Sequence, residues 1–250
     1  MYSRKDVSSI TLTKALLISD VHIESGRTIQ SVITPAPNYP IIVAGDLGRV
    51  ENTKEYNKAI AWLCSNFKWV FLVPGNHEYY TPNTQMQMSD IDNIFNTLEN
   101  MYPNLFVFRN EWAVIEGIVV YGGPLWSYVP SQNFKMQYLI KDNNLVSASQ
   151  MNSMYFECVL RIQEAINYAT RRGMKCMVVT HYAPSYNGTL HEKWDGNKYN
   201  CMYSSNLDDM VENNCIQMWI YGHTGFNGRR GKLTTNQCDK DGYRKDILAT

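Results

Sequence analysis

The stretch Trp69–Glu78 reads WVFLVPGNHE and joins a short apolar run to a group of polar residues. A continuous apolar run that is rich in β-branched residues is typical of a strand buried on both faces. In open α/β sheets, ligand sites form just beyond the carboxyl ends of the strands. This stretch therefore predicts a buried strand that delivers Asn76 and His77 to a site.

Four other segments share this design, an apolar run that ends in acidic, imidazole or glycine residues. They are residues 15–22 (ALLISDVH), 40–48 (PIIVAGDLG), 176–181 (CMVVTH) and 218–225 (MWIYGHTG). The five strand ends together deliver Asp20, His22, Asp46, Asn76, His77, His181 and His223. A single histidine at a strand end would be interpreted as a hydrogen-bonded residue near the edge of the core. Here, however, four of the chain's five histidines fall at these positions. We therefore expect one shared site.

Amphipathic helices are predicted between these strands, from apolar residues that recur at helical spacing. They span Thr53–Cys64, Gln85–Asn100, Ser149–Arg172 (ended by Gly173) and Asn206–Glu212. Further strands are predicted at Leu105–Phe108, Glu111–Ile115 and Gly117–Gly122, with a late edge strand at Gly231–Thr235. Strands that alternate with helices indicate a layered α/β protein, and residues 1–250 contain no convincing linker, so we expect a single domain.

The charge and cysteine content limit the classes of partner. The chain has 23 basic and 23 acidic residues, which argues against a global electrostatic grip on nucleic acid. The six cysteines form no C-x-x-C pair, and the first residues lack the apolar segment of a signal peptide. No apolar run is long enough to cross a bilayer. We expect a cytoplasmic protein with reduced cysteines, no membrane partner and a disfavoured nucleic-acid partner.

The residue types at the strand ends suit divalent metals. Imidazole together with carboxylate oxygen favours Mn, Fe, Zn or Ni over Ca, and the lack of thiolate argues against a structural zinc site. An aspartate at the centre of such a set can bridge two cations through its two oxygens. Two adjacent cations can share a hydroxide, lower its pKa and clamp a phosphoryl group during in-line attack.

Five motifs resemble, in order and rough spacing, those of the calcineurin-like metallophosphoesterase superfamily. They are DVH at 20–22, GD at 45–46, GNHE at 75–78, TH at 180–181 and GHT at 222–224. Each is weak alone, but together they are highly specific and span most of the chain. Segments 73–80 (VPGNHEYY) and 181–184 (HYAP) are similar to those of compact single-domain bacterial and phage members. The resemblance implies an α/β fold, a two-layer β-sandwich flanked by α-helices.

The resemblance also implies a role for each strand-end residue. The first metal is expected at Asp20, His22 and Asp46, and the second metal at Asp46, Asn76, His181 and His223. Asp46 matches the bridging carboxylate. His77 matches the histidine that contacts phosphate and protonates the leaving group, a task suited to a side chain whose pKa lies near neutrality. Manganese is the metal that we expect to support activity in vitro.

One position departs from the family pattern. Many relatives end the last motif in G-H-x-H, and that final histidine completes the first metal site, whereas this chain has Gly225. The phosphoprotein phosphatases are active with a similar three-residue first metal site. We therefore favour an active site that retains its first metal less tightly over a partly degenerate site that works poorly. The chain reads Gly45-Asp46-Leu47-Gly48-Arg49 and lacks those enzymes' full G-D-x-x-D-R-G, so protein dephosphorylation is not strongly supported.

Several further residues have two interpretations. Arg49 and His191 are candidate substrate contacts, together with Asn76, although each of the first two also reads as an ordinary loop residue. Glu78 either orients a metal ligand or caps the next helix. Trp126 is expected in the core. Core packing is also slightly favoured over nucleobase stacking for Tyr79, Tyr80, Tyr182 and Tyr186.

The sequence thus predicts an enzyme that hydrolyses phosphate monoesters or diesters of small molecules with a hydroxide bridged by two metals. Asp46 and His77 are the residues expected to take part in catalysis. Two alternatives stay open, a nuclease and a non-catalytic interaction module on the same fold. The long polar and aromatic loop at 183–205 is expected to carry function, and the sequence does not indicate an oligomeric state.

Overall fold

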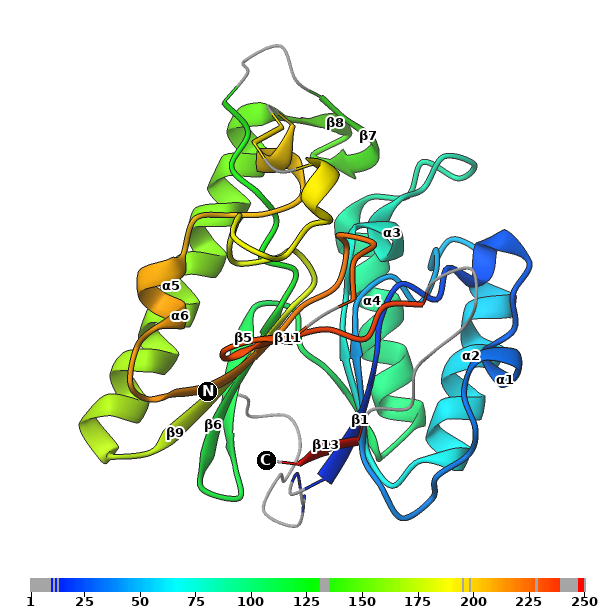
Figure 1. Cartoon of the computed structure of the whole chain (residues 1–250). Helices are drawn as coiled ribbons and strands as arrows, with labels where there is room; N and C mark the ends of the chain where they lie inside the picture. Colours follow the sequence, from blue (N-terminus) through cyan, green and yellow to red (C-terminus); the bar gives the residue numbers. More distant parts are fainter. Residues whose placement is uncertain are drawn as a thin grey trace.

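The computed structural model describes residues 10, 12, 14–130, 135–194, 196–197, 199–227, 229–238 and 247–249. Two sheets lie face to face, and the long helices cover their outer faces (Figure 1). The two-layer sandwich that the resemblance implies is therefore confirmed. In the part of the chain that is described, no helix combines the length and apolar character needed to cross a membrane.

The first sheet has the strand order β13-β1-β2-β3-β4. Its strands are β1 (Lys14–Ile18), β2 (Ile41–Ala44), β3 (Val70–Val73), β4 (Leu105–Val107) and β13 (Ile247–Ala249). Strands β1 to β4 are mutually parallel, and only β13 runs antiparallel to its neighbour. Every residue of β2 and β3 is buried, as their continuous apolar sequences predict.

The second sheet has the order β11-β12-β10-β9-β6-β5. Its strands are β5 (Glu111–Ile115), β6 (Ile118–Gly123), β9 (Lys175–Thr180), β10 (Ile216–Ile220), β11 (Arg229–Arg230) and β12 (Leu233–Thr234). Strands β6, β9, β10 and β12 are parallel. Glu116 and Gly117 join β5 to β6 with φ of 49° and 77°, so this tight turn has the left-handed backbone of a type I′ hairpin.

Helices occupy the outer faces of both sheets (Figure 1). They are α1 (Ile29–Val32), α2 (Thr53–Asn66), α3 (Asn76–Tyr79), α4 (Met88–Met101), α5 (Ala148–Arg172) and α6 (Asp208–Val211). The short helices η1 (Ile23–Ser25), η2 (Glu192–Trp194) and η3 (Asn200–Met202) lie in loops, and β7 (Lys135–Lys141) pairs with β8 (Asn144–Ser147) in a hairpin. Gly173 ends α5 with φ of 62°, the left-handed cap expected there.

Two apolar layers hold the sandwich together. Between the sheets, side chains such as Leu17, Phe71, Val120, Val179 and Ile220 are almost completely buried. A second and larger cluster lies beneath the helices. Burial of each large apolar side chain contributes about 1.5–3 kcal/mol, so this packing fixes the relative position of the strand ends.

The predicted elements differ from the observed ones in several places. The predicted edge strand Gly231–Thr235 is β12, which lies between β10 and β11 rather than at the edge. Helix α4 begins at Met88 instead of Gln85, because Gln87 and Asp90 form a capping box at its start. The hairpin β7–β8 and strand β13 were not predicted. All six cysteines are reduced, as expected.

Candidate metal centre

The loops that follow the parallel strands meet at one edge of the sandwich. The backbone N–H groups of Asp20 and His22 donate to the carbonyl oxygens of Gly45 and Asp46, each at 3.0 Å, so the loops after β1 and β2 run side by side. In the second sheet, the N–H of Gly222 donates to the carbonyl of His181 at 2.9 Å. The shared site predicted from the sequence therefore has a structural basis.

The backbone is left-handed at four of the clustered residues. Asp20, His22, Asp46 and His223 have φ between 51° and 68°. For residues other than glycine this conformation costs about 1–2 kcal/mol each. Such strain persists where the surrounding structure imposes it, and it gathers at functional sites.

Two glycines allow the side chains of the cluster to approach the backbone. A Cβ atom at Gly45, which has φ of 87°, would overlap the imidazole ring of His181. A Cβ atom at Gly75 would overlap the carboxylate of Asp46 and come within 2.7 Å of the His181 ring. The glycine of each motif is thus needed for close packing around Asp46 and His181.

His181 lies at the centre of the cluster and is completely buried. Its Nδ1 donates to the carbonyl oxygen of Ala44 at 2.9 Å. Its Nε2 lies 3.1 Å from Oδ2 of Asp46 and 3.1 Å from Oδ1 of Asn76. Nitrogen and oxygen atoms that can each bind a metal thus converge on one point, where either a proton on Nε2 or a cation can join them.

One oxygen of the Asp46 carboxylate accepts a backbone hydrogen bond, and the other faces the histidines of the cluster. Its Oδ1 accepts the N–H of His77 at 2.8 Å. Its Oδ2 lies 3.1 Å from Nε2 of His181 and 3.8 Å from Nε2 of His22. Asp46 Oδ2 therefore faces two separate imidazoles, which is the position required of a bridging ligand.

The pKa values show how strongly the buried charges interact. Burial lowers the pKa of His181, but the carboxylates of Asp46 and Asp20 outweigh burial and raise it to about 9. Burial, followed by the charge of Asp46, raises the pKa of Asp20. Two carboxylates buried together repel each other, so positive charge between them is favourable.

His223 completes this side of the cluster. Its backbone N–H donates to both oxygens of Asp20, at 3.0 and 3.1 Å, and its ring is hydrogen-bonded to the backbone of Met202. Burial and the nearby His181 lower its pKa to about 3. The ring is therefore neutral, and neutral imidazole is the form that binds metals.

Glu24 is a member of the site that the sequence did not reveal. Its Oε1 lies 3.1 Å from Nδ1 of His22 and 2.7 Å from Nδ1 of His77. Burial raises its pKa, but the hydrogen bonds from both histidines lower it to about 2. Its nearness to His22 in the chain was a weak signal, whereas its contact with His77 depends on the fold.

Glu78 connects the loops that follow β2 and β3. Its Oε2 accepts the N–H groups of Asp46 and Gly75 at 2.9 and 2.8 Å, and its Oε1 accepts that of Leu47 at 2.8 Å. Burial and the charge of Asp46 raise its pKa to about 7. The carboxylate both caps α3 and fixes the backbone of Asp46, so the two interpretations of Glu78 hold together.

Among the residues that the structure describes, three groups of side chains have the geometry to hold a metal ion. They are Asp20–His22–Asp46, Asp46–His181–His223 and His22–Glu24–His77, in each of which the ligand atoms lie within 4.8 Å of one another. The first two share Asp46 and agree with the two ligand sets implied by the resemblance. Carboxylate and neutral imidazole donors suit a divalent cation, so the residues present fit a pair of such ions.

The other candidates from the sequence lie outside this cluster. Arg49 is half-buried, and its Nε is buried without a hydrogen-bond partner. His191 is exposed, and its Nδ1 accepts the N–H of Lys193. Trp126 is 3% exposed and packs against Tyr79 and Tyr182, so these three residues belong to the core as favoured.

A comparison with known proteins identifies the family of this chain. Residues 13–225 match the calcineurin-like phosphoesterases, whose members are metal-dependent hydrolases. The chain belongs to this family. It is 25% identical over 239 residues to the uncharacterized protein L509 of Acanthamoeba polyphaga mimivirus, covering 85% of this chain and 84% of that protein.

A solved structure supports the fold. The crystal structure of phosphopantetheinyl hydrolase (PptH) from Mycobacterium tuberculosis is similar to this chain with a TM-score of 0.59 and 18% sequence identity. The likeness covers 92% of this chain and 89% of that one. At this identity it is a likeness of fold.

Proposed function

We propose that this chain hydrolyses phosphate monoesters or diesters with two divalent cations, of which manganese is the favoured one in vitro. The observation that carries the proposal is the convergence of buried groups able to bind a metal, from His181, Asp46 and Asn76, on one point. Despite burial, nearby carboxylates raise the pKa of His181, so a proton on Nε2 joins these groups when no cation does. A divalent cation can replace that proton and bind all three groups.

The proposed ligands follow the geometry of the cluster. Asp20 and His22 hold the first ion, Asn76, His181 and His223 hold the second, and Asp46 serves both. When bound, the two ions supply a hydroxide nucleophile at neutral pH and neutralise charge on the phosphoryl oxygens. The protein keeps the ligands in place through the hydrogen bonds that Nδ1 of His181 donates to the carbonyl of Ala44 and that Nδ1 of His22 donates to Glu24.

His77 is the proposed acid toward the leaving group. Its side chain is 26% exposed, so a substrate can reach it. Its Nδ1 faces Glu24 at 2.7 Å, which leaves Nε2 on the opposite side of the ring to donate a proton to the departing oxygen. The hydrogen bond to Glu24 holds the ring in this orientation.

Arg49 and Asn76 are the proposed contacts to the phosphoryl oxygens. The Nε of Arg49 is buried without a partner, and its guanidinium lies near enough to Tyr80 to lower the pKa of that phenol. Tyr80 in turn shares a side-chain hydrogen bond with Asn76. A phosphate beside Asn76 would give the guanidinium the anionic partner that it lacks. For His191 a substrate contact stays a prediction.

The first ion is proposed to bind more weakly than the second. It has three protein ligands, whereas the second has four. Gly225, where many relatives have another histidine, is exposed with φ of 63°, and a Cβ atom there would meet nothing within 4 Å. A Cβ atom would have room at this position, whereas the left-handed backbone favours glycine.

The direct test is hydrolysis of p-nitrophenyl phosphate and bis(p-nitrophenyl) phosphate in the presence of Mn²⁺ or Ni²⁺. Asp46→Ala and His181→Ala should each lower kcat/KM by more than about 100-fold, beyond the 10–100-fold typical of partners that only orient a ligand. Asp209→Ala, an exposed carboxylate in α6, is the control and should match the original protein. Activity that survives both cluster substitutions would contradict the proposal.

The two alternatives are separated by simple measurements. A nuclease that has bound its ions would cleave single-stranded oligonucleotides. The zero net charge of the chain instead favours small esters as substrates. A non-catalytic module would hydrolyse none of these substrates, although its metal content per chain could match that of an enzyme. Both assays use protein purified without chelator.

A further inference from the structure

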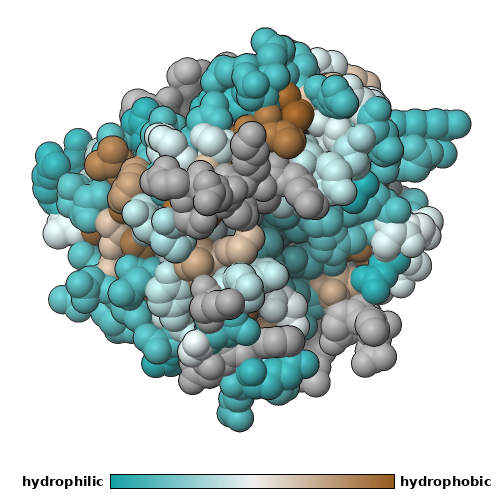
Figure 2. Space-filling model, turned by 90° about the horizontal axis from the view of Figure 1, so that it is seen from above, coloured by the Kyte–Doolittle hydropathy of each residue, from teal (hydrophilic) through white to brown (hydrophobic). Residues whose placement is uncertain are grey.

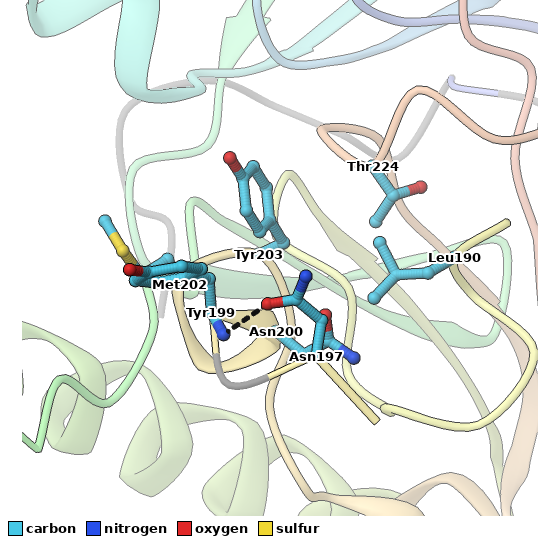
Figure 3. Close-up of a pocket in the computed structure, with 7 residues that line it drawn as sticks. All are labelled: Leu190, Asn197, Tyr199, Asn200, Met202, Tyr203 and Thr224. Carbon is cyan, nitrogen blue, oxygen red and sulfur yellow. Dashed lines mark hydrogen bonds between the residues drawn. The ribbon is translucent and has the colours of Figure 1, made fainter. Parts of the chain in front are cut away.

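A pocket of about 470 Å³ lies between the loop at 183–205 and the loop that follows β10. The described residues that line it are Leu190, Asn197, Tyr199, Asn200, Met202, Tyr203 and Thr224 (Figure 3). Its volume lies within the roughly 300–1,000 Å³ of small-molecule sites. None of these residues is a member of the proposed catalytic cluster.

The pocket shares a wall with the metal centre. The ring of Tyr203 lies 5.3 Å from that of His223, with an angle of 33° between the two planes. Thr224 follows His223 directly in the chain, and the backbone of Met202 is hydrogen-bonded to the His223 ring. A phosphate ester held at the cations can therefore extend the rest of the molecule into this pocket.

The described lining is aromatic and amide-bearing. The side chains of Tyr199 and Tyr203 are 55% and 43% exposed, so both rings can be reached by a ligand. Asn197 and Asn200 bring carboxamides, which offer donor and acceptor atoms in one plane. The Oδ1 of Asn197 accepts the N–H of Tyr199 at 2.9 Å, so one of these amides is held in place (Figure 3).

These properties select among the organic groups of phosphate esters. The described lining offers rings and amides, which suit a neutral planar group. The coloured residues at this end of the molecule are mostly hydrophilic (Figure 2). A flat neutral heteroaromatic group fits, because it stacks on tyrosine and pairs its edge with amides.

We propose that this pocket binds the nucleobase of a mononucleotide, whose phosphate ester lies at the metal centre. This inference rests on the proposed function, because it assigns the substrate class of the same site. The tyrosines proposed to stack on the nucleobase are Tyr199 and Tyr203. Tyr79 and Tyr182, which the sequence analysis weighed for this role, are buried.

The test compares adenosine 5′-monophosphate with glycerol 2-phosphate, at saturating Mn²⁺. The original protein should prefer the nucleotide in kcat/KM. Tyr199→Ala should reduce that preference by roughly 5- to 100-fold, as expected for the loss of one stacking contact. Tyr128→Ala is the matched control, because Tyr128 is 45% exposed and packs against Tyr155 and Phe156 instead.

Adenosine alone provides a second measurement that does not depend on catalysis. Calorimetric titration should show binding to the original protein and to Tyr128→Ala, with at least a fivefold weaker Kd for Tyr199→Ala. An unchanged preference in Tyr199→Ala together with no adenosine binding would overturn the inference. If no ester is hydrolysed but adenosine binds in a Tyr199-dependent way, the proposed function fails while the nucleobase pocket stands.

Discussion

At the scale of single residues, Glu24 gives the site a connection between metal binding and proton transfer. Its Oε1 faces Nδ1 of both His22 and His77, and the two imidazole rings lie 4.4 Å apart. Through His22 it orients a proposed metal ligand, and through His77 it orients the proposed acid. Glu24 itself is a positioning residue, because it acts through the two histidines.

Glu24→Gln should lower kcat about 10- to 100-fold for a phosphate ester with a poor leaving group, such as an alkyl phosphate. The loss should be smaller for p-nitrophenyl phosphate, because p-nitrophenolate departs without a proton. A purely structural defect would lower both rates equally. Glu157→Gln, an exposed site on α5, is the control, and Mn²⁺ titration of each variant reveals any loss that arises through His22.

Glu24 also shows where sequence analysis reaches its limit. Each predicted ligand directly follows an apolar strand, so its position could be inferred from local sequence and from the rule that parallel strands end together. The contact between Glu24 and His77 joins residues 53 positions apart and requires the left-handed turn at His22, with φ of 51°. No local pattern specifies that turn.

At the scale of secondary-structure elements, Glu78 holds the loops after β2 and β3 together. Three backbone N–H groups donate to it, which requires a carboxylate with acceptors on both oxygens. Elements with weaker local signals escaped prediction. Strand β13 pairs with β1 across a separation of more than 200 residues in the chain. In the hairpin β7–β8, Leu139 and Val146 are buried whereas Tyr138 and Leu145 are exposed.

Glu78→Gln should destabilise the protein by about 1.5–3 kcal/mol, because an amide NH₂ would face one of the N–H donors. Thermal unfolding should show a Tm lower by roughly 3–12 °C. Affinity for Mn²⁺ should fall as well, since the backbone of Asp46 loses its support.

Glu51→Gln is a matched control: Glu51 accepts the backbone N–H groups of Asn83 and Thr84, away from the cluster. That variant should lose stability and keep its metal affinity, and equal metal affinity in both would refute this role.

At the scale of the whole molecule, the candidate metal centre spans the joint between the two sheets. Asp20, Asp46 and Asn76 follow strands of the first sheet, whereas His181 and His223 follow strands of the second. Cations bound by both sets would join the layers at the edge where buried carboxylates otherwise repel each other. Metal binding should then stabilise the entire fold and not only the loops.

The expected size follows from binding linkage. A cation present at 100 times its Kd stabilises the folded state by about 2.7 kcal/mol, which corresponds to a rise in Tm of roughly 5–10 °C for a chain of this length. Calorimetric scans with Mn²⁺ and then with excess EDTA should show the rise and its reversal. His181→Ala removes one of the two ligands that follow strands of the second sheet and should abolish most of the shift, whereas Asp209→Ala should retain it. A Tm that does not respond to millimolar Mn²⁺, or a full response in His181→Ala, would show that no ion is held between the layers, because a ligand that binds only the folded state must raise its stability.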